Sequence, residues 1–67
     1  MAIVKVIELV ADSNESWEDA TQVAVTEASK TVKNIKNVFV KNFQAMVDDD
    51  KVVKYRVNVK VSFVVED

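Results

Sequence analysis

An apolar side chain stands at every odd-numbered position from Val53 to Val65, whereas the even positions from Lys54 to Ser62 are all polar. This two-residue period predicts one long β-strand with an apolar face and a charged face. At about 3.3 Å per residue such a strand would span roughly 43 Å, more than twice the usual length. A chain of 67 residues cannot bury it alone, so the pattern favours an oligomer.

The rest of the chain predicts the order β-α-β-β in one α+β domain, residues 1–67. Residues 3–10 are β-branched and mostly apolar on both faces, as in a strand covered from two sides. Ser13, with Asp12 as its competitor, is the predicted N-cap of an amphipathic helix of about twenty residues. Its apolar stripe consists of Trp17, Ala20, Thr21, Ala24, Ala28, Val32 and Ile35.

A second strand is predicted over residues 38–47, and a turn at 48–51 leads to the final strand. A right-handed crossover makes the first two strands parallel, so the final strand can lie between them, antiparallel to both, in the order 1-3-2. One helix shields only part of such a sheet. Other apolar residues alternate along the strands with those expected to meet the helix, so they should lie on the uncovered face. They predict a subunit interface: Val4, Val6, Val10, Val38, Val40 and Met46.

Composition excludes most familiar chemistry. The chain has no Cys, His or Gly, which excludes disulfides, thiol nucleophiles, imidazole bases and glycine-rich phosphate loops. A net charge of −2 argues against a nucleic-acid partner, and no apolar run is long enough to span a membrane. The start lacks the pattern of a signal peptide, so we expect a cytoplasmic protein.

Three segments resemble the dodecin family: KVIELV at 5–10, DSNESWEDA at 12–20 and YRVNVKVSF at 55–63. The resemblance covers nearly the whole chain. It implies a three-stranded antiparallel sheet wrapped on one helix and twelve copies forming a hollow homododecamer of cubic symmetry. It also implies flavins, FMN or riboflavin, stacked in pairs at subunit contacts for storage and photoprotective quenching rather than catalysis.

The positions that carry flavin binding in typical members differ in this chain. The tryptophan that stacks on the isoalloxazine ring is matched by Asn37, which has no aromatic face. The glutamine after the third-strand tyrosine is matched by Arg56, which cannot accept a hydrogen bond. An arginine and glycine pair is replaced by Gln44 and Ala45. The chain therefore resembles a flavin-poor member, and the candidate ligand-binding residues are Arg56, Asn37, Gln44 and Asn42.

The aromatic residues have a packing role and an alternative ligand role. Trp17 lies on the helix stripe and is expected to anchor the core, the alternative being a replacement stacking platform. Phe39 and Phe43 are expected to share one face of the second strand, with Tyr55 on the apolar face of the third.

Two charged features leave ligand classes open. The run from Asp48 to Asp50 is expected to be a solvated turn, since it lacks the spacing of a calcium-binding loop. The alternative is a cation site, such as calcium, shared between subunits near a symmetry axis; its candidate ligands are Glu8, Asn42, Gln44 and Glu66, but the sequence does not locate it. The even-numbered residues of the final strand form a polar face that includes Lys54, Arg56, Asn58 and Lys60. This face is either an anion site or a solvated surface paired with Glu8 and the acids of neighbouring copies.

These observations leave three hypotheses: a non-enzymatic shell that stores a small ligand, a flavin store that uses Arg56, and a calcium-binding or purely structural shell. An enzyme is not favoured, because only carboxylates, Lys and Tyr could serve as acids or bases and no pair has diagnostic spacing.

Overall fold

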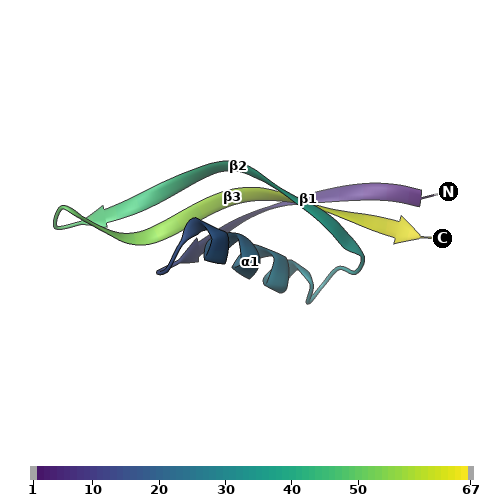
Figure 1. The fold of residues 1–67 in the computed structure, drawn as a ribbon. Coiled ribbons are helices and arrows are strands. Elements are labelled where there is room, and N and C mark those ends of the chain that lie inside the picture. The colour runs from purple at the N-terminus through teal and green to yellow at the C-terminus, as the bar shows by residue number, and fades with distance from the viewer. Residues whose placement is uncertain (1, 67) are drawn as a thin grey trace.

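The computed structural model describes residues 2–66, with side chains over 3–65. The chain folds as β1 (Ala2–Ser13), α1 (Trp17–Ala28), β2 (Ile35–Asp48) and β3 (Lys51–Glu66). The three strands form one antiparallel sheet in the order β1-β3-β2, with α1 packed on one face, here called the inner face (Figure 1). The predicted α+β class, element order and strand order are confirmed.

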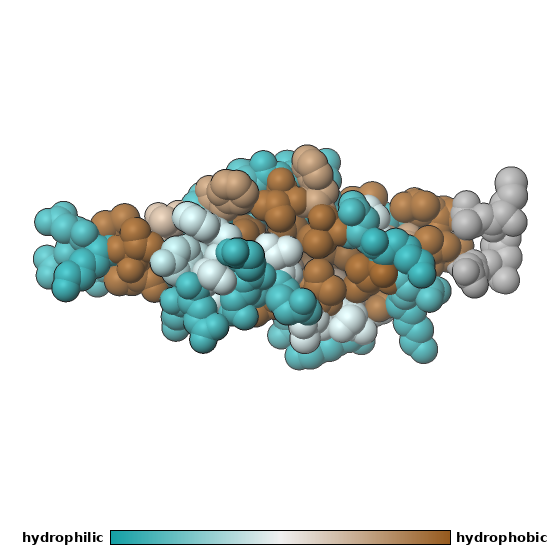
Figure 2. Space-filling model, viewed as in Figure 1, coloured by the Kyte–Doolittle hydropathy of each residue, from teal (hydrophilic) through white to brown (hydrophobic). Residues whose placement is uncertain are grey.

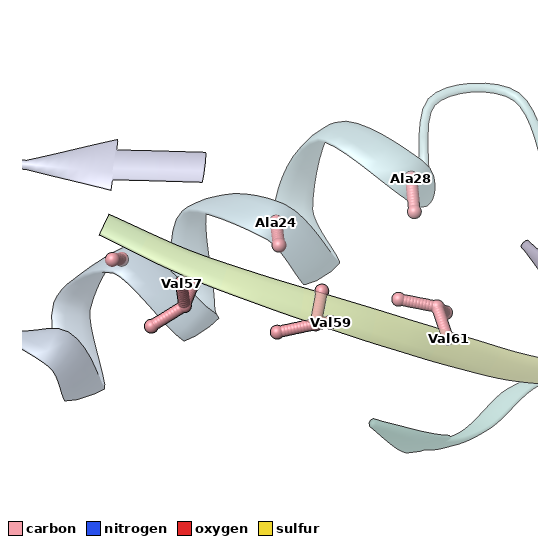
Figure 3. Packing of buried hydrophobic residues seen from close by; sticks show 6 residues of the cluster. Ala24, Ala28, Val57, Val59 and Val61 are labelled. Carbon is pink, nitrogen blue, oxygen red and sulfur yellow. The ribbon is translucent and has the colours of Figure 1, made fainter. Parts of the chain in front are cut away.

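The core is an alanine face on α1 packed against a valine row on β3 (Figure 3). The side chains involved are Ala20, Ala24, Ala28, Val57, Val59 and Val61, none more than 4% exposed. Alanine lets the helix axis approach the sheet closely, and β-branched valine fills the pleated surface opposite. The two-residue period predicted for β3 is therefore confirmed at its centre.

The helix is shorter than predicted and starts later. Ser16, not Ser13 or Asp12, is the N-cap, and its side chain accepts a 2.9 Å hydrogen bond from the Asp19 backbone N–H. Ser13 ends β1 instead, where its hydroxyl accepts from the Glu15 N–H and donates to the Asp19 carboxylate.

The helix ends at Ala28, where the backbone tightens: Lys30 N–H donates to the Glu27 carbonyl and Thr31 N–H to that of Ala28. Nearby hydroxyls bond the last carbonyls. Ser29 Oγ donates to the Thr26 carbonyl oxygen, and Thr31 Oγ1 donates to that of Ala28. Val32 and Ile35 still pack against the core, but from the segment after the helix and from β2.

An extra residue in β2 reverses which side chains face the helix. β3 pairs Val59 with Val40 but Asn58 with Asn42, so Lys41 is a β-bulge. Val38 and Val40 consequently pack on the core, and the prediction that they face away from the helix is wrong. The expectation that Phe39 and Phe43 share a face is wrong for the same reason, because Phe39 pairs with Lys60 and Phe43 with Val57.

The opposite face of the sheet, here called the outer face, keeps the other predicted apolar residues. Val4, Val6 and Val10 are 53–62% exposed, and Met46 pairs with Lys54 on the same face.

The predicted acidic turn is confirmed. Asp49 and Asp50 both have positive φ, as in two-residue hairpin turns that Asp tolerates.

The helix covers only part of the sheet. Its 12 residues rise about 18 Å, whereas the molecule is 52 Å long. Apolar surface therefore continues beyond the helix, toward the tip of the β2–β3 hairpin and toward the end where the termini lie (Figure 2). Val47, Val52 and Val53 are exposed at the hairpin end.

The alanine face predicts a steric limit. Ala24→Leu should lower the free energy of unfolding by about 1–3 kcal/mol, because the added carbons have no room between α1 and β3. Val23→Leu, at a half-exposed position one residue away, should change stability by less than about 0.5 kcal/mol. Urea unfolding at equal subunit concentration measures both, and equal effects would contradict close packing at Ala24.

Candidate functional site

The outer face carries a band of polar side chains across the middle of the sheet, here called the outer polar strip. β3 contributes its even-numbered residues, and the register places partners from β1 and β2 on the same face. The strip consists of Glu8, Asp12, Lys41, Asn42, Gln44, Lys54, Arg56, Asn58 and Lys60.

One row of the strip crosses all three strands through Arg56. Asp12 of β1 and Gln44 of β2 are its two register partners. Arg56 Nε donates to Asp12 Oδ1 at 2.7 Å, and Nη2 donates to Oδ2 at 3.0 Å. The two side chains remain 38% and 32% exposed, so this bidentate pair is reachable from solvent. The hydrogen bond lowers the pKa of Asp12 and raises the pKa of Arg56.

A second ion pair bridges β1 and β2 over the central strand. Lys41 Nζ donates to Glu8 Oε2 at 3.0 Å. This hydrogen bond is the main reason that the pKa of Glu8 is lowered, with smaller contributions from Asn58 and Lys60. Asn58 Oδ1 is buried and has no hydrogen-bond partner among the described residues. The bulge that displaces Lys41 from the ladder thus also supplies the partner of Glu8.

The structure brings three of the four predicted ligand-binding residues together. Gln44 lies opposite Arg56, and Asn42 lies opposite Asn58 in the next row. Asn37 lies opposite Ser62, six residues farther along β3 and about 20 Å from Arg56. A single chain therefore does not place Asn37 and Arg56 in one site. Their roles in binding stay predictions.

The even face of β3 is paired in part as expected, although by different partners. Glu8 is held by Lys41 rather than by a cation of β3, and Asp12 holds Arg56. The sequence predicts Asp12 only as a competing helix cap, so its pair with Arg56 is not among the expectations. The sequence signal for this pair is an acid and a base at even-numbered positions of the first and last strands. It can be read only once the register of β1 on β3 is known.

Trp17 lies on the inner face, away from the outer polar strip. Its ring centroid is 5.1 Å from that of Tyr55 and 5.6 Å from that of Phe43. Its Nε1–H donates to the backbone carbonyl of Gln44 at 2.9 Å. The expected packing role is confirmed by these two rings, but Trp17 is 37% exposed and lies outside the buried cluster, so its expected place in the core is wrong. The reason is that β1 ends at Ser13, opposite Tyr55, so the first turn of α1 lies where only β2 and β3 continue.

The described part of one copy shows neither a metal cluster nor a pocket. Among the side chains of residues 3–65, no three Asp or Glu gather in a group that could hold a metal ion, and the described chain encloses no pocket. The side chain of Glu66, one candidate cation ligand, lies outside the described residues. No helix in the described part of the chain has both the length and the apolar character needed to cross a membrane.

Comparisons with known proteins agree on one family. A family model described as Dodecin matches residues 3–66. A Mycobacterium tuberculosis protein described as calcium dodecin is 35% identical over 63 residues, covering 94% of this chain and 89% of the relative.

Solved structures show the same fold. An arginine-to-alanine variant of the T. thermophilus dodecin superposes with a TM-score of 0.93 at 31% identity, with 100% of both chains covered. The M. tuberculosis calcium dodecin, described as calcium chelating with a novel calcium-binding site, gives a TM-score of 0.82 at 33% identity. That match covers 96% of this chain and 91% of the other.

The two ion pairs predict an acid-sensitive stability. Because the folded state lowers the pKa of Glu8 and Asp12 below their ordinary values of 4.5 and 3.8, their contribution is present above those values. It is lost as the pH falls through the lowered values. The urea midpoint should therefore fall below about pH 4.5. Asp12→Asn should reduce this fall, whereas Asp49→Asn, on the hairpin turn, should not; an unchanged profile for Asp12→Asn would contradict the assignment.

Proposed function

Because the chain belongs to the dodecin family, we propose that it assembles into a hollow homododecamer that binds and stores a small ligand without catalysing a reaction. The observation that carries this proposal is the exposed apolar surface of a chain whose described residues enclose no pocket. Large apolar side chains lie bare on the outer face and at both ends of the sheet. Burying them between copies would stabilise the fold and would create the concave sites that one copy lacks.

Flavin is not the ligand that the outer face supports best. Asn37 offers no aromatic surface for ring stacking, and Arg56 is already engaged by Asp12. Gln44 keeps an amide beside Arg56, so flavin storage through Arg56 is the second candidate. Its affinity would be lower because the stacking contribution is missing.

Calcium binding is a further candidate, supported by the M. tuberculosis relative. Within the described part of one chain the support is weak, since Glu8 and Asp12 each hold a cationic side chain. A calcium site in this protein would need carboxylate or amide oxygens from several copies. We therefore place an organic ligand before calcium.

Assembly gives the first test. Native mass spectrometry of the wild-type protein should give a particle of about twelve subunits, since one small sheet cannot bury its outer face alone. Val6→Asp should prevent assembly by placing an unpaired charge in an interface, whereas the isosteric control Val6→Thr should assemble. A wild-type monomer would contradict the shell, and a Val6→Asp particle of wild-type mass would show that Val6 lies outside every interface.

Ligand class gives the second test. Fresh protein should show no flavin absorbance, and Asn37→Trp combined with Arg56→Gln should raise riboflavin affinity at least about tenfold by restoring the stack and the amide. Lys36→Trp combined with Arg56→Gln, which adds the ring one residue away, should not. Wild-type affinity equal to that of the Asn37→Trp/Arg56→Gln variant would contradict the proposal. Calcium retained in fixed ratio would favour the calcium candidate.

A further inference from the structure

The guanidinium of Arg56 is held by Asp12 along one edge, and its other edge is free in the described part of the chain. A guanidinium has five N–H donors, and Asp12 takes one from Nε and one from Nη2. Three N–H donors, two on Nη1 and one on Nη2, therefore have no partner among the described residues. One N–H of Nη1 and the remaining N–H of Nη2 lie parallel at the end of the planar guanidinium. These two parallel donors have the geometry that binds both oxygens of a carboxylate or phosphate. The ion pair thus leaves a preformed oxyanion fork on a side chain that solvent can reach.

The surroundings of this fork favour a negative ligand. Within the outer polar strip, the basic residues Lys41, Lys54, Arg56 and Lys60 outnumber the acids Glu8 and Asp12, although the whole chain has a net charge of −2. Lys54 is close enough to Asp12 to lower its pKa. The charge that Asp12 neutralises on Arg56 is therefore partly restored by its neighbour.

Polar and apolar neighbours complete the site. Gln44 lies across the strand from Arg56 and offers an amide that can donate or accept. Val10, in the row next to Asp12, is largely exposed and offers apolar surface to the organic part of a ligand. The arrangement suits an organic anion better than a free inorganic ion.

We infer that the free edge of Arg56, oriented by Asp12, binds the carboxylate or phosphate group of a small organic ligand. This inference rests on the proposed ligand-binding function and names the class of ligand. Asp12 is a positioning residue, since it acts on the ligand through Arg56. The competing interpretation is an ordinary solvated ion pair, for which only the net charge would matter.

Calorimetric titration of the assembled protein at low salt tests the ligand class. The probes are benzoate, phenyl phosphate and the neutral isostere benzamide. At least one anion should bind ten or more times more tightly than benzamide, and the comparison of the two anions distinguishes a carboxylate ligand from a phosphate ligand. Equal binding of all three probes would overturn the inference.

Three variants distinguish binding by the two parallel donors of Arg56 from binding by the net positive charge of the outer polar strip. Arg56→Lys keeps the charge but loses the two parallel donors, so affinity for the preferred anion should fall at least tenfold. Lys54→Gln removes a neighbouring charge and keeps the fork, so affinity should fall less than threefold. Asp12→Asn should weaken binding, because the guanidinium is no longer held. A stronger interaction in Asp12→Asn, or equal losses in Arg56→Lys and Lys54→Gln, would indicate a diffuse field and overturn the inference.

Native mass spectrometry of each sample keeps the two proposals distinguishable. A wild-type protein that fails to assemble contradicts the proposed function. An intact particle that does not prefer either anion contradicts only the role of Arg56.

Discussion

The contact between the alanine face of α1 and the valine row of β3 determines the rest of the structure. It buries Ala24 and Val59 almost completely, but a helix of about 18 Å cannot cover a molecule 52 Å long. Longer side chains on the helix would lift it from the sheet, and a longer helix would leave less apolar surface bare. The short, close contact therefore accounts both for a well-packed centre and for apolar ends that the helix leaves exposed.

The bulge at Lys41 determines on which face of the sheet the side chains of β2 lie. One extra residue in β2 sends Val40 to the core and leaves Asn42 and Gln44 on the outer face. The same residue extends over the sheet to hold Glu8. The inward position of Val40, the aromatic contact of Phe43 with Trp17, and the outward positions of Asn42 and Gln44 thus depend on this one of the three register shifts in β2.

The sequence predicts those features that a regular period encodes. The alternation along β3, the β-α-β-β order and the exposed Val4, Val6 and Val10 followed from local pattern, and the structure agrees. The predicted helix length is wrong because the tightened backbone bonds and hydroxyl contacts that follow Ala28 have no periodic signal in the sequence. The faces of β2 were wrong because a bulge depends on cross-strand register. The pair of Asp12 and Arg56 joins residues far apart in the chain, so no local pattern could reveal it.

Because the candidate residues lie far apart in one chain, the proposed ligand binding would depend on the proposed assembly. Asn37 lies about 20 Å along the sheet from Arg56, so substitutions at both positions can act on one ligand only if different copies bring them together. Arg56, in contrast, has its orientation fixed within one chain by Asp12. If copies meet across their outer faces, the proposed site would combine a locally rigid oxyanion fork with walls supplied by neighbours. The fold of one chain would then determine which polar groups the site recognises, and the arrangement of the copies would determine the shape of the site.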